Sequence, residues 1–265
     1  MGRLRTGREY ETPGNSPYRP EVVSTPPGAD MTELKFPPRP NLRPYNLSRE
    51  FMKYPGRNHP DIGKWLVETY TKPGDWIVDP MCGVGQMWLI TPRNRPIAFS
   101  DHCNDAHDIM LSRAAVGITM QFSSAETVRP WPFIRRQHIG LVAFSPPYPQ
   151  SHNAGATEHQ IKMRDEKGDH AIQGFEGLPP DMPRVYANIA SWGHPTLAVV
   201  LRNKIELGKE TCWVEQNAAM IHAAGYTHLE EFWRFVYPTR WQQAKLKRDP
   251  TTPVIDREWI LVATK

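Results

Sequence analysis

The sequence predicts an α/β fold in which helices cover both faces of a mostly parallel, doubly wound sheet. From residue 60 onward, apolar runs of strand length alternate with amphipathic segments of helix length, which is typical of parallel strands joined by crossover helices. A turn with two glycines, residues 79–86, joins the first apolar run to a helical segment. The last two apolar runs, 227–237 and 257–265, have no helical pattern between them, which predicts an antiparallel strand at one edge of the sheet.

The individual elements follow from short patterns. Residues 60–72 place apolar side chains at helical spacing between Pro60, which can start a helix, and Pro73, which ends it. A short helix is expected around residues 86–90. Longer helices are expected at 105–115, 184–193 and 211–225, and strands at 76–79, 96–101, 118–124, 139–145 and 196–203.

Composition indicates one sizeable domain behind an N-terminal arm. The chain has 265 residues, of which 39% are hydrophobic and 23% charged, so one α/β domain is expected over residues 51–265. Nine of the 27 prolines lie within residues 1–50, which predicts an extended, partly disordered arm there. Three cysteines and the lack of an apolar run of membrane-spanning length predict a cytoplasmic protein without a membrane partner.

The first candidate site is the turn "DPMCGVGQ" at residues 79–86. Asp79 ends an apolar strand, and Gly83 and Gly85 allow the sharp turn and close backbone approach that a bound nucleoside requires. The turn has neither the third glycine of a dinucleotide fingerprint nor the lysine of a phosphate-binding loop. A neutral adenosyl cofactor therefore fits better than a nucleotide polyphosphate, and a strand-to-helix turn without any ligand is the alternative.

Asp101 is the second candidate, about twenty residues after the glycine turn and at the end of the next strand. An acidic side chain there can accept hydrogen bonds from both ribose hydroxyls of a nucleoside. It can also cap the helix expected after it. The two roles are compatible, so both remain open.

The third candidate is the tetrapeptide Ser145-Pro146-Pro147-Tyr148, which ends the apolar run 139–144. Neither proline can donate to a sheet ladder, so the strand stops and holds Ser145 and Tyr148 stiffly at its carboxyl end. In a doubly wound 3-2-1-4-5 sheet this strand lies beside the one before the glycine turn. The serine oxygen and the Pro146 carbonyl can accept N–H bonds from an amino group while Tyr148 stacks on a base. The alternative is a strand stopped by prolines with a surface tyrosine.

The motifs "DPMCGVG" and "SPPY" together resemble the amino-methyltransferases that use S-adenosylmethionine to methylate exocyclic nitrogens of DNA bases, over about residues 50–265. The resemblance implies a seven-stranded Rossmann-like methyltransferase sheet, and its serine tetrapeptide favours N4 of cytosine over N6 of adenine. Met81 and Gln86 stand where the family usually has phenylalanine and threonine. The cofactor-binding residues implied are Asp79, Pro80, Met81, Cys82, Gly83, Gly85, Asp101, His59 and Pro60.

DNA is the expected partner, and RNA is less favoured. A base inside a duplex must be flipped out before it can react, which requires backbone contacts. The segment 232–249 interleaves aromatic and basic residues, and its second half is expected to be a basic loop. Residues 150–182 are expected to form a mobile insertion that closes over the target. The proposed nucleic-acid contacts are Arg240, Lys245, Lys247, Arg248, His152 and Asn153.

The sequence disfavours some other chemistries and leaves several alternative functions open. Methylation of cytosine carbon 5 needs a cysteine nucleophile, conventionally after a proline, and none of the three cysteines follows one. The segment 101–108 has poor spacing for zinc, so no metal is expected. For Asn203, at the end of the strand 196–203, a helix-cap or turn role and a substrate contact are equal alternatives. An RNA base methyltransferase and a catalytically idle nucleic-acid-binding module are the remaining functions, and a monomer or homodimer is expected.

Overall fold

The computed structural model describes most of the chain from residue 58 onward and two short segments before it. The helix expected at 105–115 and residues 150–180 of the expected insertion lie outside the described residues. No helix in the described part is long and apolar enough to cross a membrane. The described residues are 21–23, 31–37, 58–91, 94–101, 118–122, 125, 129, 134, 138–146, 181–203, 205–206, 209–210, 212–236, 240–249 and 256–265.

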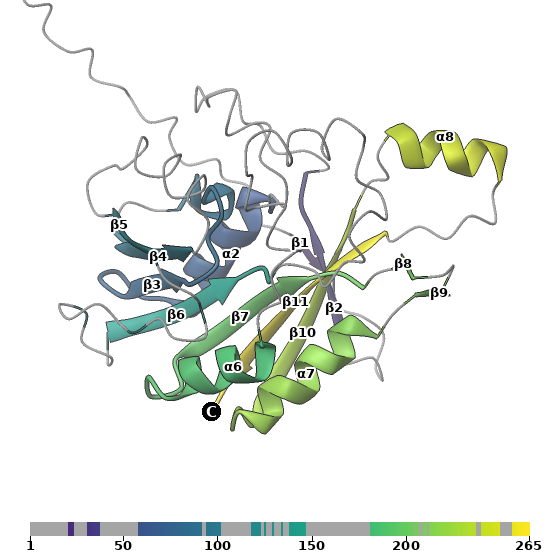
Figure 1. Cartoon of the computed structure of the whole chain (residues 1–265). Coiled ribbons are helices and arrows are strands. Elements are labelled where there is room, and N and C mark those ends of the chain that lie inside the picture. Colours follow the sequence, from purple (N-terminus) through teal and green to yellow (C-terminus); the bar gives the residue numbers. More distant parts are fainter. Residues whose placement is uncertain are drawn as a thin grey trace, which may run out of the picture.

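A mixed sheet organises the described part of the chain (Figure 1), in the order β1-β2-β10-β11-β7-β6-β3-β4-β5. β3 is parallel to β4 and β6, β5 is parallel to β4, and β7 is parallel to β6. β11 is antiparallel to both β7 and β10. The strands are β1 (Glu21–Val23), β2 (Met31–Lys35), β3 (Trp76–Asp79), β4 (Ile97–Asp101), β5 (Ile118–Phe122), β6 (Ile139–Phe144), β7 (Thr196–Leu201), β10 (His228–Phe235) and β11 (Arg257–Thr264).

This order confirms the doubly wound fold predicted from the sequence. Strands β5-β4-β3-β6-β7 stand in the expected 3-2-1-4-5 order, and β11 and β10 complete a mostly parallel set of seven. One detail differs from the expectation. The antiparallel strand β11 lies between β7 and β10 instead of at an edge, because β11 returns beside β7 and β10 is outermost only among these seven strands.

Helices cover both faces of the sheet. Successive residues of a strand point to opposite faces, so Ile77 and Val78, adjacent in β3, belong to two different apolar cores. Helices α6 (Met182–Ala190) and α7 (Trp213–Ala223) pack on the Val78 side. Helix α2 (Pro60–Tyr70) packs on the Ile77 side. Figure 1 shows α6 and α7 together on one face and α2 on the other.

Part of the proline-rich arm belongs to the sheet. β2 pairs in parallel with β10, and β1 adds an antiparallel strand beyond it. The side chain of Leu34 is 1% exposed and lies in the same core as α2. Residues 28–36 contain no proline, so the backbone N–H groups of β2 are available to a sheet ladder. Amino-acid composition alone therefore does not reveal this short strand within the expected arm.

The segment between the last two strands contains a helix, which corrects the basic loop expected there. Helix α8 (Arg240–Arg248) has the sequence RWQQAKLKR, without glycine, proline or a β-branched residue. Intrinsic propensity therefore favours a helix, although its few apolar residues give a weak helical pattern. In Figure 1 α8 stands away from the sheet. A small hairpin, β8 (Ile205–Glu206) and β9 (Lys209–Glu210), follows β7.

Candidate functional site

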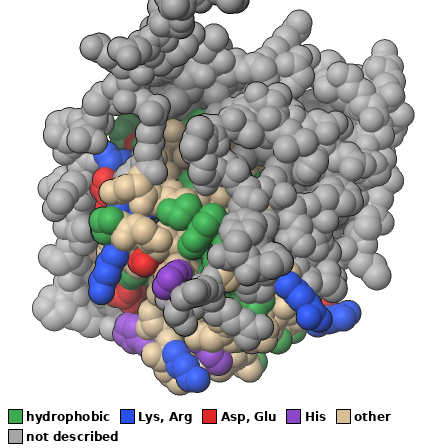
Figure 2. All heavy atoms as spheres, turned by 90° about the vertical axis from the view of Figure 1, so that its left-hand side faces the viewer, with side chains coloured by type: hydrophobic (Ala, Val, Ile, Leu, Met, Phe, Trp, Pro, Cys, Tyr) green, Lys and Arg blue, Asp and Glu red, His purple; other side chains and the backbone are tan. Residues whose placement is uncertain are grey.

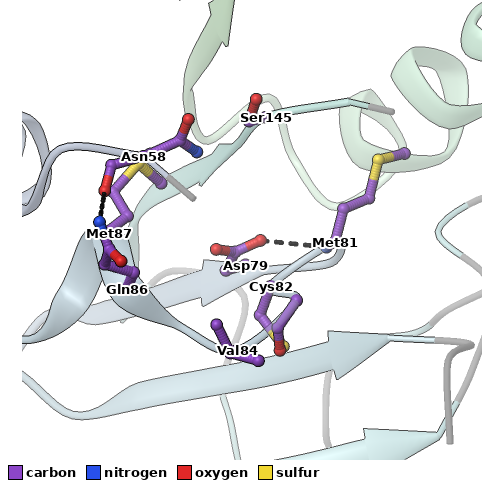
Figure 3. Close-up of a pocket in the computed structure, with 9 residues that line it drawn as sticks. Asn58, Asp79, Met81, Cys82, Val84, Gln86, Met87 and Ser145 are labelled. Atoms are coloured by element: carbon purple, nitrogen blue, oxygen red, sulfur yellow. Dashed lines mark hydrogen bonds between the residues drawn. The ribbon is translucent and has the colours of Figure 1, made fainter. Parts of the chain in front are cut away.

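A pocket lies at the carboxyl ends of β3 and β6, the neighbouring strands at which the strand order reverses. Ligands bind at such positions in parallel sheets because the two connections leave the strands in opposite directions. Figure 3 shows the loop after β3 on one side of the pocket and Ser145, after β6, on another. The lining residues are Asn58, Asp79, Met81, Cys82, Gly83, Val84, Gln86, Met87 and Ser145.

The pocket brings together one residue from each of the two predicted motifs. Gly83 of the glycine turn and Ser145 of the tetrapeptide both line it. Pro146 is buried next to Ser145 in the chain. The positions of Pro147 and Tyr148 lie outside the described residues, as do those of His152 and Asn153.

The glycine turn has a backbone that depends on its glycines. Gly83 has a φ of 50° and Gly85 a φ of 65°, left-handed values that residues with a Cβ rarely adopt. The N–H of Gly85 donates to the carbonyl of Cys82 at 2.8 Å, and the N–H of Cys82 donates to the carbonyl of Ser100 in β4 at 3.1 Å. The turn therefore leads tightly from β3 into η2, a 3₁₀ helix (Gln86–Trp88) that replaces the short helix expected there.

Asp79 holds this turn in place from the end of β3. Asp79 is only 2% exposed. One carboxylate oxygen accepts from the N–H of Met81 at 3.0 Å, and the other accepts from Nε1 of Trp88 at 2.6 Å. Both donors are neutral, and the described lining contains no Lys or Arg. The pocket is therefore suited to a neutral or cationic ligand and unsuited to a polyphosphate.

The opposite wall comes from the segment before α2. Nε2 of Gln86 donates to the carbonyl of Asn58 at 2.7 Å. A Cβ on Gly63 would lie 2.0 Å from the carbonyl oxygen of Met87, so only glycine allows α2 to approach η2 this closely. Sequence reasoning missed four lining residues, Asn58, Val84, Gln86 and Met87. The departure of Gln86 from the family pattern was the one signal available.

His59 and Pro60 adjoin Asn58 without forming part of the described lining. His59 caps α2, its Nδ1 accepting from the N–H of Asp61 at 3.3 Å, and Pro60 is the first helical residue. The imidazole stacks on Phe36, with ring centroids 6.0 Å apart. Burial, reinforced by the nearby charge of Arg234, lowers the pKa of His59 to about 4. The imidazole is therefore neutral at pH 7.

Asp101 and Asn203 lie at the same edge of the sheet in different settings. Asp101 is the last residue of β4, beside β3, and its side chain lies outside the described residues. Asn203 is 9% exposed, and its Oδ1 accepts from the N–H of Val214 at 2.9 Å. Of the two roles left open for Asn203, the structure thus shows a cap on the first turn of α7.

A buried charge cluster lies at the same sheet edge. Glu258 is 1% exposed. Its Oε1 accepts from Nε and Nη2 of Arg202 at 2.9 and 2.6 Å, and its Oε2 accepts from Nε of Arg234 at 2.6 Å. Burial alone would raise the pKa of Glu258, but the two guanidinium groups lower it below its ordinary value. Sequence reasoning gave no sign of this cluster.

The basic residues proposed for nucleic acid lie on α8. Lys247 and Arg248 are exposed, whereas the side chains of Arg240 and Lys245 lie outside the described residues. β10 runs in the same direction as β7 because both are antiparallel to β11. The connection that carries α8 therefore leaves the sheet from its pocket edge. On the face shown in Figure 2, which is turned away from α8, the described Lys and Arg side chains stand apart from one another.

No group of three or more His, Cys, Asp or Glu side chains in the described part of the chain is placed to hold a metal ion. The segment 101–108, considered for zinc, lies outside that part except for the backbone of Asp101.

The sequence matches no protein-family model and no curated protein. Similar solved structures include an S-adenosylmethionine dependent methyltransferase from Mesorhizobium loti, 11% identical over 77% of this chain and 98% of that one, with a TM-score of 0.42. TrmN from Thermus thermophilus is 13% identical over 82% and 52% of the two chains, with a TM-score of 0.43.

Haemonchus contortus phosphoethanolamine N-methyltransferase 2, solved with phosphomonomethylethanolamine and S-adenosylhomocysteine, is 9% identical over 79% and 53%, with a TM-score of 0.48. The chain thus spans about half the length of the Thermus and Haemonchus proteins. Likenesses this distant carry no argument about the ligand or the reaction, which rest on the pocket itself.

Proposed function

We propose that this chain is an S-adenosylmethionine-dependent methyltransferase that acts on an exocyclic amino nitrogen of a base in DNA, with N4 of cytosine favoured over N6 of adenine. One observation carries the proposal: Gly83 and Ser145 line a single pocket between β3 and β6. A turn suited to a nucleoside cofactor and a turn suited to an amino group thus share one space. A methyl donor and an acceptor nitrogen held by them can approach in line.

The residues of the described pocket fit this cofactor. When bound, S-adenosylmethionine supplies a methyl group on a positively charged sulfur. The lining offers the carboxylate of Asp79, the carboxamide of Gln86 and no cationic side chain, so the charge of the site favours a cationic ligand. Gly83 allows close approach of the backbone. Asp101 ends β4, where a ribose-binding acid is expected.

The target side is built to hold an amino group. The oxygen of Ser145 and the carbonyl of Pro146 can each accept an N–H bond from the exocyclic nitrogen. Two such bonds draw its lone pair out of conjugation with the base and direct it toward the methyl group. Tyr148 stacks on the extruded base in this proposal and limits its rotation. The protein thus contributes orientation and electrostatic stabilisation.

DNA is proposed as the polymer because the connection that carries the basic helix α8 leaves the sheet from its pocket edge. Lys247 and Arg248 of α8 are exposed, and the connection that carries them follows β10. Contacts to the phosphate backbone supply free energy that can offset base flipping, which requires a few kcal/mol. Residues 150–180, with His152 and Asn153, are proposed to close over the flipped base, whereas Asp181 and Met182 of the expected insertion instead begin α6.

The test is methyl transfer from tritiated S-adenosylmethionine to double-stranded DNA, single-stranded DNA and RNA of matched sequence, followed by nucleoside analysis. We expect label in N4-methylcytosine from DNA. Label only in N6-methyladenine would change the base, and label only in RNA would change the polymer. Binding of S-adenosylhomocysteine and DNA without any transfer would overturn the enzymatic proposal and support the idle binding module.

Two variants separate chemistry from folding in this assay. Ser145→Ala and Tyr148→Ala should each lower kcat, on the order of 100-fold for the serine if it orients and polarises the amino group. Both should leave the Kd for S-adenosylhomocysteine within a few-fold of the wild-type value, because the cofactor contacts lie on the other side of the pocket. An equal loss of kcat and cofactor affinity would mean that the tetrapeptide is only structural.

A further inference from the structure

The carboxamide of Gln86 is buried in the pocket, and its oxygen accepts no hydrogen bond from the described residues. Gln86 is 7% exposed and lines the pocket. Its Nε2 donates to the carbonyl of Asn58 at 2.7 Å. No described residue donates to its Oε1. Buried acceptors in proteins almost always have a donor, so this oxygen points to a donor supplied by a bound molecule.

The orientation of this carboxamide is fixed by its partner. The Asn58 carbonyl can only accept a hydrogen bond, so the NH₂ group of Gln86 must face it. Exchanging the nitrogen and oxygen would place two oxygens 2.7 Å apart. Figure 3 shows the amide nitrogen of Gln86 on Asn58, with the oxygen on the side of Asp79. The unpaired atom is therefore an acceptor, and its ligand must present a donor.

The position of Gln86 indicates which part of an adenosyl cofactor is near it. Asn58 precedes α2, which packs against η2 and contacts β6. β4, which ends at Asp101, lies on the other side of β3. A cofactor whose ribose is at the end of β4 therefore extends its amino-acid end toward Gln86. In that end, the α-ammonium has three N–H donors and the carboxylate has none.

We propose that Oε1 of Gln86 accepts a hydrogen bond from the α-ammonium of the methionine part of S-adenosylmethionine. This inference rests on the proposed function, since it assigns a contact to that cofactor. The carboxylate of Asp79 lines the same pocket, and its negative charge attracts the same ammonium. Gln86 thereby makes the site selective for adenosyl ligands that retain the α-amino group.

Calorimetry with two ligands tests this contact. The first ligand is S-adenosylhomocysteine, and the second is its analogue in which hydrogen replaces the α-amino group. The wild-type protein should bind the first ligand at least tenfold more tightly, because a charged donor meets a buried acceptor. In Gln86→Met, which keeps the side-chain length and removes the acceptor, this ratio should fall to within about twofold of one.

Two further variants are controls. Gln216→Met makes the same substitution at an exposed position of α7, outside the pocket lining, and should leave the ratio of the two affinities unchanged. Gln86→Glu keeps an acceptor oxygen and loses the donor to Asn58, so it should keep a ratio above tenfold even if both affinities fall. Thermal unfolding of each variant shows that the protein is folded.

The outcomes separate this inference from the proposed function. Equal affinity of the wild-type protein for the two ligands, or an equal loss of both in Gln86→Met, would overturn the Gln86 contact and leave the cofactor in place. Failure of the wild-type protein to bind either ligand would overturn the cofactor itself, and the contact with it. A ratio that falls only in Gln86→Met supports the inference.

Discussion

Two buried carboxylates at the same edge of the sheet are held in opposite ways. Asp79, at the end of β3, accepts from the backbone N–H of Met81 and the indole N–H of Trp88. Glu258, on β11, accepts from the guanidinium groups of Arg202 and Arg234. These two donors to Asp79 are neutral, whereas the donors to Glu258 are cationic. Both residues are nearly inaccessible to solvent.

The difference indicates which carboxylate belongs to a binding site. Asp79 lines the pocket, and the described lining has no Lys or Arg side chain. The charge of Glu258 is cancelled by its own neighbours, so it has little left to attract a ligand. We therefore interpret Asp79 as part of the functional pocket and the Glu258 cluster as part of the framework beside it.

The largest effect on stability is expected for Glu258→Gln. Removing the negative charge from a buried ion pair leaves uncompensated charge, which costs about 3–5 kcal/mol, and here two arginines lose the carboxylate that they share. Urea denaturation at pH 7 measures the free energy of unfolding. Glu215→Gln, at an exposed position of α7, is the matched control and should change it by less than about 0.5 kcal/mol. A similar small change for Glu258→Gln would show that the cluster is not a framework element.

A slightly smaller effect on the free energy of unfolding is expected from lowering the pH, because of His59. Its pKa is about 4 in the folded protein, against an ordinary 6.5. Between these values the unfolded chain takes up a proton and the folded protein does not, so stability falls as the pH drops from 6.5 to 4 and levels off below. The shift corresponds to about 3 kcal/mol.

Urea denaturation of the wild-type protein and His59→Gln between pH 7 and 4 isolates this contribution. The variant should lose about 3 kcal/mol less over the range. Burial raises the pKa of Asp61, which acts in the opposite direction, but Asp61 is present in both proteins and cancels in the difference. Parallel pH profiles would contradict the buried neutral state of His59.

A moderate effect on stability is expected for Trp88→Phe, which removes one of the neutral donors to Asp79. The substitution keeps an aromatic ring and removes the N–H that reaches the carboxylate at 2.6 Å. Leaving a buried carboxylate oxygen without this donor should reduce the free energy of unfolding by about 1–3 kcal/mol. The affinity for S-adenosylhomocysteine, measured by calorimetry, should fall several-fold because the glycine turn loosens.

Trp213→Phe is the matched control for the indole. Nε1 of Trp213 is buried and has no acceptor among the described residues, so removing it should cost little hydrogen-bond energy and leave ligand affinity unchanged. Equal effects of the two substitutions would mean that the Trp88 contribution is packing alone, and Asp79 would then not depend on the indole.

The fold could be predicted from the sequence because its signals are local. The apolar runs of β3, β4, β6 and β7 are bounded by clear breakers, and the alternation with helices selects a parallel sheet. The helix α8 was missed because its few apolar residues give a weak pattern, although its propensity is high. β2 was missed because five residues without proline are inconspicuous in a proline-rich segment.

The candidate site could be predicted only for residues that lie within a single short sequence motif. The glycine turn and Ser145 are recognisable because glycine and proline restrict the backbone in ways that the sequence displays. Asn58 and Gln86 meet only in the folded chain, since their hydrogen bond joins the segment before α2 to the start of η2. The inward position of Arg234 likewise depends on its pairing opposite Glu258 in the last two strands.

The double substitution Lys247→Glu with Arg248→Glu on α8 should have the smallest effect on stability and the most specific effect on DNA binding. Both side chains are exposed, so the free energy of unfolding should change by less than about 0.5 kcal/mol per site. DNA affinity should fall, and the slope of log K against log salt should decrease by about two if both cations contact phosphates. The affinity for S-adenosylhomocysteine should not change.

The control pair is Lys72→Glu with Lys265→Glu, exposed cations that precede β3 and follow β11. β3 and β11 are antiparallel in the sheet through β6 and β7, so both lysines lie at the edge opposite the pocket while the net charge changes equally. A salt slope that decreases for both pairs alike would mean that DNA responds to overall charge. A decrease confined to the α8 pair would place the polymer at the pocket edge, where Ser145 can reach a base.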